Sequence, residues 1–211
     1  MDFSSSLGTE VREVRDVEHD GQPARAVEGS RFYPTEIDDL WDALTSAERL
    51  PRWFLPVDGD LEPGGRYQLK GNAGGAIEHC DPPKVLRITW EYGGNVSWVA
   101  VRLALEEAGT RLTLVHTMLK DEASEAHWAK YGPGATGVGW DLAIQALGLH
   151  IAAGEALDLE AWEAWTASDE GKVFLRACAE AWGEAHIAAG EDAGVARAMA
   201  ERTAKFYTGA E

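Results

Sequence analysis

Cysteine and basic residues are scarce in this sequence of 211 residues. The two cysteines, Cys80 and Cys178, lie far apart and outside any CxxC or CxxH pattern, so neither a disulfide framework nor a zinc site is expected. Only 19 lysines and arginines oppose 36 aspartates and glutamates, which gives a formal charge of -17. Such a surface repels phosphate backbones and anionic lipids. We therefore expect no nucleic acid and no membrane partner. The charge does not exclude neutral or cationic binding partners.

Long hydrophobic runs and catalytic signatures are also missing. No stretch approaches the roughly 20 apolar residues of a membrane span, and the first residues lack the basic region and apolar core of a signal peptide. We therefore expect a cytoplasmic protein with reduced thiols. There is no GxSxG, HExxH or calcium-loop pattern, and the histidines have no metal-ligand spacing. We expect no metal and no cofactor.

Hydrophobic content of 45% and nine tryptophans predict a folded chain, and residues 131–154 are its organising segment. Crowded glycines lead into a predicted helix over 138–153. Its apolar residues at helical spacing are Trp140, Ile144, Leu147 and Ile151. This spacing predicts an amphipathic helix with one apolar face to be covered. We expect the glycines to let the helix start close to a sheet, and to bend as a lid over a cavity mouth.

We predict that the segment from Ala24 to Leu119 covers the apolar face of this helix. Alternating apolar and polar residues favour antiparallel strands at 24–33, 66–70, 76–80, 85–92, 96–105 and 111–119. A short helix pair follows the first strand, with Thr35 and Asp38 resembling a capping box. A polar connector joins the last strand to the glycines. The expected fold class is α+β, with a curved antiparallel sheet wrapped around one long helix.

The two ends of the chain differ from this central part in composition. Residues 1–23 are polar, and we expect a mobile segment or a peripheral strand. Residues 155–211 are rich in Ala, Glu and Trp, and three apolar stripes predict a helical extension at 158–166, 168–187 and 192–208, with Ser168 and Asp192 as N-caps. The stripes must be covered by the sheet, by each other or by a second subunit. We therefore expect a domain over 24–154 and a homodimer through the C-terminal helices as one option.

Several collinear motifs resemble one known family. They are Trp41-Asp-Ala-Leu-Thr, Glu48-Arg-Leu-Pro-Arg-Trp53-Phe, Pro63-Gly-Gly-Arg-Tyr, Cys80-Asp-Pro-Pro-Lys-Val-Leu-Arg-Ile-Thr-Trp90-Glu, Gly109-Thr-Arg-Leu-Thr-Leu-Val-His116-Thr and Gly137-Val-Gly-Trp140-Asp. Over residues 24–153 they resemble the AHSA1 family, the domains related to the activator of the Hsp90 ATPase, within the SRPBCC or START-like superfamily. The resemblance implies a helix-grip fold with an apolar cavity between sheet and helix. It assigns no ligand, since activities in this superfamily diverge.

A ligand site follows from these expectations. We predict that a small hydrophobic or aromatic ligand binds among Trp53, Phe54, Tyr67, Trp90, His116, Trp140 and Ile144. The aromatic side chains would give apolar contact, and His116 a polar anchor paired with His79, Tyr67 or Asp141. The alternative is that the aromatics only fill the core and that His116 is a hydrogen-bonded core residue.

Other functions stay open on the sequence alone. Residues 132–137 spell GxGxxG ahead of a helix, but the strand that precedes a dinucleotide-binding turn is missing, so a structural role for these glycines is favoured. A cyclase-like or hydrolase-like enzyme would use the same cavity with His116 as general base. A protein-interaction, co-chaperone-like module would use residues 155–211. We expect ligand binding rather than catalysis.

Overall fold

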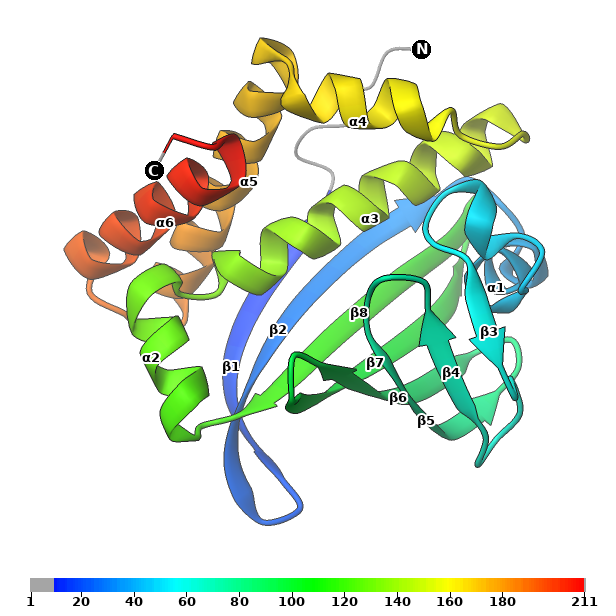
Figure 1. Cartoon of the computed structure of the whole chain (residues 1–211), viewed down its shortest axis with the longest axis horizontal. Coiled ribbons are helices and arrows are strands. Elements are labelled where there is room, and N and C mark those ends of the chain that lie inside the picture. Colours follow the sequence, from blue (N-terminus) through cyan, green and yellow to red (C-terminus); the bar gives the residue numbers. More distant parts are fainter. Residues whose placement is uncertain (1–9, 211) are drawn as a thin grey trace. The chain divides into compact units, whose positions relative to one another are not determined.

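The computed structural model of the chain describes residues 10–210, so residues 1–9 of the predicted N-terminal segment lie outside the described part. Eight strands form one antiparallel sheet in the order β1-β2-β8-β7-β6-β5-β4-β3 (Figure 1). The strands are β1 Val11–His19, β2 Gln22–Tyr33, β3 Val57–Gly59, β4 Arg66–Leu69, β5 Gly74–Asp81, β6 Val85–Tyr92, β7 Asn95–Glu106 and β8 Gly109–Leu119. The helices are α1 Ile37–Thr45, η1 Leu50–Arg52, α2 Glu122–Tyr131, α3 Gly134–Ala153, α4 Leu159–Ala167, α5 Asp169–Ala188 and α6 Ala193–Thr208. The predicted α+β class is confirmed.

Contacts divide the chain into two compact units, which share β2 and α3. In its described part, unit 1 consists of residues 10–29, 119–142 and 158–210. Unit 2 consists of Ser30–Met118 and Ala143–Leu157. Each unit is described by itself below.

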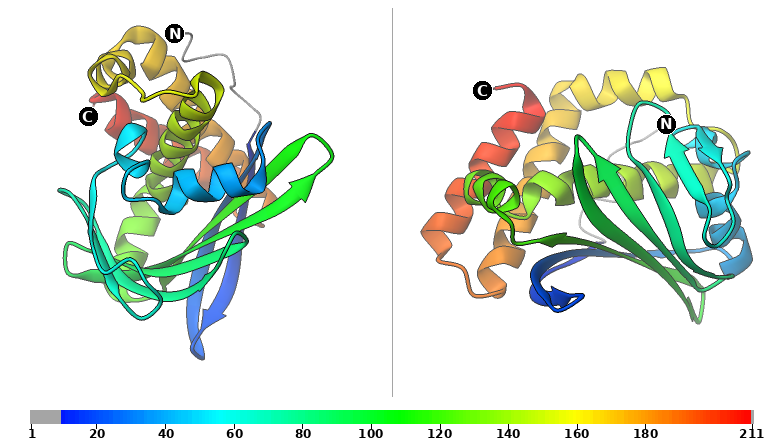
Figure 2. Two further views of the ribbon diagram at one scale, coloured as in Figure 1. Left: turned by 90° about the vertical axis from the view of Figure 1, so that its right-hand side faces the viewer. Right: turned by 60° about the horizontal axis from the view of Figure 1, so that its bottom comes forward.

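Unit 2 is a run of antiparallel hairpins from β3 to β8, curved around the second half of α3 (Figure 2). Residues directly opposite each other on paired strands point to the same face. The register places Ile88 opposite Val99, and Val99 opposite His116, so these three side chains share one face. Val99 is 2% exposed, and the equivalent positions Leu103 and Leu112 are 5% and 1% exposed. The core of unit 2 therefore lies on this face, as the alternation in the sequence predicted.

Unit 1 is mainly helical, with β1 against α5 and with α2 and α5 both in contact with α6. Its helix starts follow the sequence prediction. Ser168 accepts a hydrogen bond from the backbone N–H of Gly171, and Asp192 accepts one from Val195. Gly209 ends α6 in the left-handed conformation with φ of 66°, which suits glycine.

The predicted start and amphipathic character of the long helix were wrong. α3 begins at Gly134, so Gly137 and Gly139 lie inside it. A Cβ at Gly137 would overlap the indole ring of Trp182 on α5, so this glycine permits close helix contact and is no hinge. Buried residues occur all round the helix, among them Val138, Asp141, Ile144 and Leu147. A helix covered on all sides needs no polar face.

Three local predictions also differ from the structure. Thr35 does not cap α1: its hydroxyl donates to Asp39 Oδ2 at 2.7 Å, and Glu36 holds the N-cap position without a side-chain bond. The polar connector contains helix α2, capped by Asp121, whose side chain accepts from Ser124 N–H. β3 adds an edge strand that the sequence pattern did not predict, whereas β1 is the peripheral strand that was one option for the N-terminal segment. Within residues 10–210, no helix is long and apolar enough to cross a membrane.

Candidate functional site

The apolar surface of unit 2 consists of the strand residues that share a face with Val99. We call this set the inner face: Val57, Tyr67, Leu69, Ile77, Cys80, Leu86, Ile88, Trp90, Ser97, Val99, Val101, Leu103, Leu112, Leu114 and His116. The opposite, outer face carries the charged neighbours in each strand, such as Arg66, Arg87 and Arg102. Strict alternation on β4, β6, β7 and β8 produces this separation.

His116 is the only histidine of the inner face, and its polar partner is Ser97. The His116 Nε2 atom lies 2.8 Å from Ser97 Oγ, and Ser97 Oγ donates to the carbonyl oxygen of Trp90 at 3.1 Å. A serine hydroxyl has one proton, so while Ser97 donates to that carbonyl it accepts from the Nε2–H tautomer of His116. The Trp90 ring lies edge-on to the imidazole, with centroids 6.2 Å apart. Burial lowers the pKa of His116 to about 4, so the imidazole is neutral at pH 7.

The three partners predicted for His116 make other contacts. His79 pairs with Arg87 on the outer face, where the β5 bulge after Ile77 places it. The Tyr67 hydroxyl donates to the backbone carbonyl of Thr89 at 2.8 Å. Asp141 binds Arg12 and Trp182 in unit 1. Ser97 was missed, although it falls two residues before Val99 and therefore on the same face.

Three predicted aromatic residues of unit 2 join one hydrophobic cluster. Tyr67 is buried in it, and Phe54 and Trp90 are half-buried against it. Trp53 stacks on Phe54 with ring centroids 5.4 Å apart, and its indole N–H donates to the carbonyl of Ala43 at 2.9 Å. These contacts fix Trp53 between α1 and the chain after η1, and its part in a ligand site stays a prediction.

The two predicted residues on α3 fall in different units. Ile144 is 1% exposed in unit 2, and its carbonyl accepts the Tyr33 hydroxyl at 2.9 Å. Trp140 is half-buried on the part of α3 that belongs to unit 1. The structure therefore groups six of the seven predicted residues in one unit, and the use of all seven in a ligand site stays a prediction.

Part of the inner face is incompletely covered within unit 2. Leu86, Ile88 and Trp90 on β6 are each half-buried, while their neighbours Val99 and Val101 on β7 are buried. Cys80 on β5 and the loop residues Leu55 and Leu61 are half-buried in the same way. Burial raises the pKa of the Cys80 thiol, so it is neutral too. The inner-face residues of β6, together with Cys80 of β5, are thus apolar side chains that the fold buries only in part.

Unit 1 contains a buried polar cluster around Asp141. The Asp141 carboxylate, 1% exposed, accepts from Arg12 Nε at 3.1 Å and from the Trp182 indole N–H at 2.9 Å, and the Cys178 thiol also bonds to it. Burial raises the pKa of Asp141 to about 6, and the Arg12 guanidinium opposes that rise. The same burial raises the pKa of the Cys178 thiol, which makes it a poor nucleophile. This cluster joins β1, α3 and α5 within unit 1.

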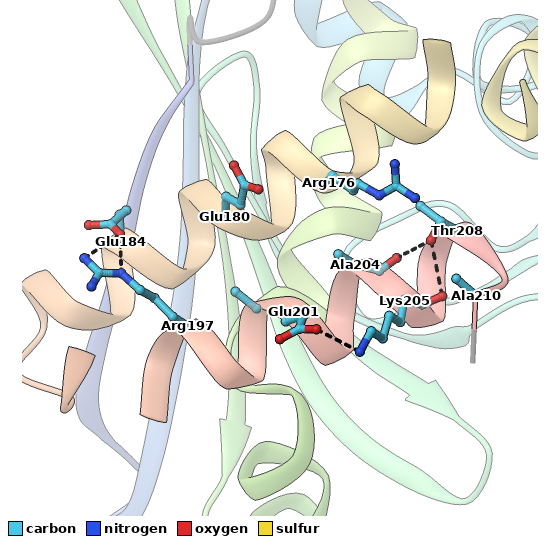
Figure 3. Close-up of a pocket in the computed structure, with 10 residues that line it drawn as sticks. Arg176, Glu180, Glu184, Arg197, Glu201, Ala204, Lys205, Thr208 and Ala210 are labelled. Carbon is cyan, nitrogen blue, oxygen red and sulfur yellow. Dashed lines mark hydrogen bonds and ion pairs between the residues drawn. The ribbon is translucent and has the colours of Figure 1, made fainter. Parts of the chain in front are cut away.

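A groove of about 500 Å³ runs between α5 and α6 of unit 1 (Figure 3). Charged side chains of both signs line it, and they pair with each other: Arg197 with Glu184 at 3.4 Å, and Lys205 with Glu201 at 2.8 Å. Paired, exposed charges of this kind contribute little free energy. In the described part of the chain, no group of three or more histidine, cysteine or acidic side chains is placed to hold a metal ion.

Comparisons with known proteins agree with this geometry. The family model described as activator of Hsp90 ATPase homolog 1-like protein matches residues 34–149, more than half of the chain. No curated protein matches the chain. The crystal structure of CalU16 from Micromonospora echinospora is 31% identical, with a TM-score of 0.66 over 83% of this chain and 97% of CalU16. The solution structure of CalU16 is 30% identical over 88% of this chain and all of CalU16, with a TM-score of 0.71.

A more distant structure shares the fold alone. DynU16, from the dynemicin biosynthetic locus, is 20% identical over 62% of this chain and 48% of its own, with a TM-score of 0.51. The family match covers every strand from β3 to β8 and nearly all of α3, which are the elements that carry the inner face. The chain therefore belongs to the AHSA1 family of activator of Hsp90 ATPase homolog 1-like proteins, within the START-like superfamily.

Proposed function

We propose that unit 2 binds a small hydrophobic or aromatic ligand against the inner face. The observation that carries this proposal is the partial exposure of Leu86, Ile88 and Trp90, which face the same way as buried residues of β7. Apolar surface left open beside a core is a common feature of ligand sites. The chain also belongs to the START-like superfamily, and the sequence resemblance to that superfamily implies an apolar cavity between sheet and helix. This membership supports ligand binding as well.

His116 would give the ligand its polar contact. Its imidazole is neutral and hydrogen-bonded to Ser97, so its ring orientation is fixed before a ligand arrives. A fixed polar group among apolar walls orients a ligand without contributing a net charge. Trp90, beside it, would supply an aromatic edge.

Binding can be tested with the uncharged fluorescent probe N-phenyl-1-naphthylamine. Ile88→Gln replaces half-buried apolar surface with an amide and should weaken binding about tenfold or more, from the loss of buried apolar area. Ala100→Gln, on the outer face of the neighbouring strand, is the matched control and should leave affinity unchanged. No binding by the original chain, or equal effects of both variants, would contradict the proposal.

A cyclase-like or hydrolase-like enzyme is the second candidate, because Ser97 and His116 are 2.8 Å apart. In a serine nucleophile the hydroxyl donates to the imidazole. Here the hydroxyl donates to the Trp90 carbonyl, which favours binding over nucleophilic attack. Turnover of a p-nitrophenyl ester that disappears in Ser97→Ala, with ligand binding retained, would favour the enzyme instead.

A homodimer through the C-terminal helices, and with it an interaction role, remains a prediction. Val173 on α5 and Val195 and Phe206 on α6 are 58%, 43% and 54% exposed. Light scattering of the original chain and of Phe206→Ser measures the oligomeric state directly. A monomer at 100 micromolar, about 10⁻⁴ M, would contradict a dimer of useful affinity.

A further inference from the structure

The inner face carries no group that is charged at neutral pH, and this limits what it can bind. Its ionisable members are Tyr67, Cys80 and His116. Burial raises the pKa of the Tyr67 phenol and the Cys80 thiol and lowers that of His116, so all three are neutral. Glu78, the extra residue of the β5 bulge next to His79 of the outer face, is exposed.

The hydroxyl and Nε2–H protons of the inner face are already donated within the protein. The hydroxyls of Tyr67 and Ser97 donate to backbone carbonyls, and the His116 Nε2–H donates to Ser97. A ligand carboxylate would find no cation among these residues, and a ligand ammonium no carboxylate. Burial of a charge without a partner is strongly unfavourable.

Two cations of unit 2, Arg31 and Arg49, contact α3, and both are engaged by the protein. Arg49 lies 3.4 Å from His150 Nε2 and forms ion pairs with Asp39 and Asp42. The Arg31 guanidinium donates to Gln145 Oε1 at 2.7 Å and lies against Gly148. It is on β2, and the sheet order places β8 and β7 between β2 and β6. Three strand spacings separate the backbones of β2 and β6 by about 14 Å. Arg31 therefore does not compensate an anion bound over β6.

The net charge of the whole chain acts in the same direction. At -17, the protein repels anions at long range, so the approach of an anionic ligand is disfavoured as well as its burial. The same charge attracts cations at long range, but the inner face offers them no carboxylate in exchange for their hydration.

We propose that the inner face selects uncharged aromatic or alicyclic molecules and excludes anions and cations with the same carbon skeleton. This inference rests on the proposed ligand-binding function and narrows its ligand class. Charge selection differs from non-selective apolar binding. A non-selective apolar surface also binds a charged molecule, because the charged group of that molecule can remain in water.

Three pyrene probes with one skeleton test the selection: 4-(1-pyrenyl)butanol, 4-(1-pyrenyl)butyrate and 4-(1-pyrenyl)butyltrimethylammonium. Binding is followed by energy transfer from tryptophan in 0.5 M NaCl, where the Debye length of about 4 Å suppresses surface attraction. We expect the alcohol to bind at least about tenfold more tightly than either ion.

The outcomes distinguish this inference from the function on which it rests. If either ion binds less than tenfold more weakly than the alcohol, charge selection is wrong while ligand binding stands. If none of the three probes binds, the proposed function fails, and the inference with it.

A variant with a cation added to the inner face tests whether the selection against anions arises there. Leu86→Arg adds a cation to the inner face and should raise the affinity for pyrenebutyrate at least about tenfold. Ala104→Arg adds the same charge to the exposed outer face and is the control. If circular dichroism shows that Leu86→Arg does not fold, Cys80→Arg replaces it, since Cys80 is directly opposite Leu86. Equal gains in the inner-face variant and the control would overturn the inference.

Discussion

The burial of His116 predicts a specific loss of stability in acid. In the folded chain burial lowers its pKa from 6.5 to about 4, whereas the unfolded chain keeps the ordinary value. The unfolded state therefore binds the proton more tightly, so His116 favours folding fully above pH 6.5, and this contribution is lost as the pH falls toward 4. For these two pKa values, the loss between pH 8 and pH 5 is about 2 kcal/mol.

Denaturant unfolding of the original chain and of His116→Gln at pH 8 and pH 5 measures this contribution. The variant keeps an N–H donor for Ser97 but cannot titrate, so it should lose about 2 kcal/mol less than the original chain over this interval. His79→Gln removes an exposed histidine of the outer face and serves as the control. A difference of less than about 0.5 kcal/mol between His116→Gln and the original chain would refute the assignment of His116 as a buried, neutral residue.

Two further predictions concern unit 1 and use the free energy of unfolding. Gly137→Ala should destabilise by about 1 to 3 kcal/mol because its Cβ overlaps Trp182, whereas Gly139→Ala, whose nearest neighbour is a hydroxyl at 3.3 Å, should stay within about 1 kcal/mol of the original chain. Equal effects at both glycines would contradict the close-contact role. Asp141→Asn should cost about 3 kcal/mol because it leaves the Arg12 guanidinium buried without its carboxylate, and Arg12→Leu in the same chain should restore part of that loss. Additive costs in the double variant would show that the pair is not coupled.

Much of the fold was predictable because each strand carries its own signal. The alternation of Leu112, Leu114 and His116 depends on neighbours two residues apart, which the sequence displays directly. The interior of α3 was not predictable in this way. Gly137 is explained by Trp182, 45 positions further along the chain, and a spacing rule confined to one helix does not contain that partner.

The candidate site was predicted in part for the same reason. Trp90 and His116 are on one face because strand periodicity places them there, whereas Ser97 was overlooked because a serine in a strand has no distinctive pattern. The partner of Asp141 was misassigned because it comes from β1, in a segment whose sequence predicted only a polar edge. Long-range polar pairs leave no local periodicity.

The sharing of α3 between two units has a consequence for how this chain can be shortened. The family match ends at 149, and a truncation designed on it would remove Trp182, Thr203 and Tyr207. These residues contact Gly137, bond to the carbonyl of Tyr131 and bond to the carbonyl of Ala135, respectively. A recombinant fragment that stops at the family boundary would thus lose side chains that contact the end of α2 and the first turns of α3, so we expect a stable fragment to need the C-terminal helices as well.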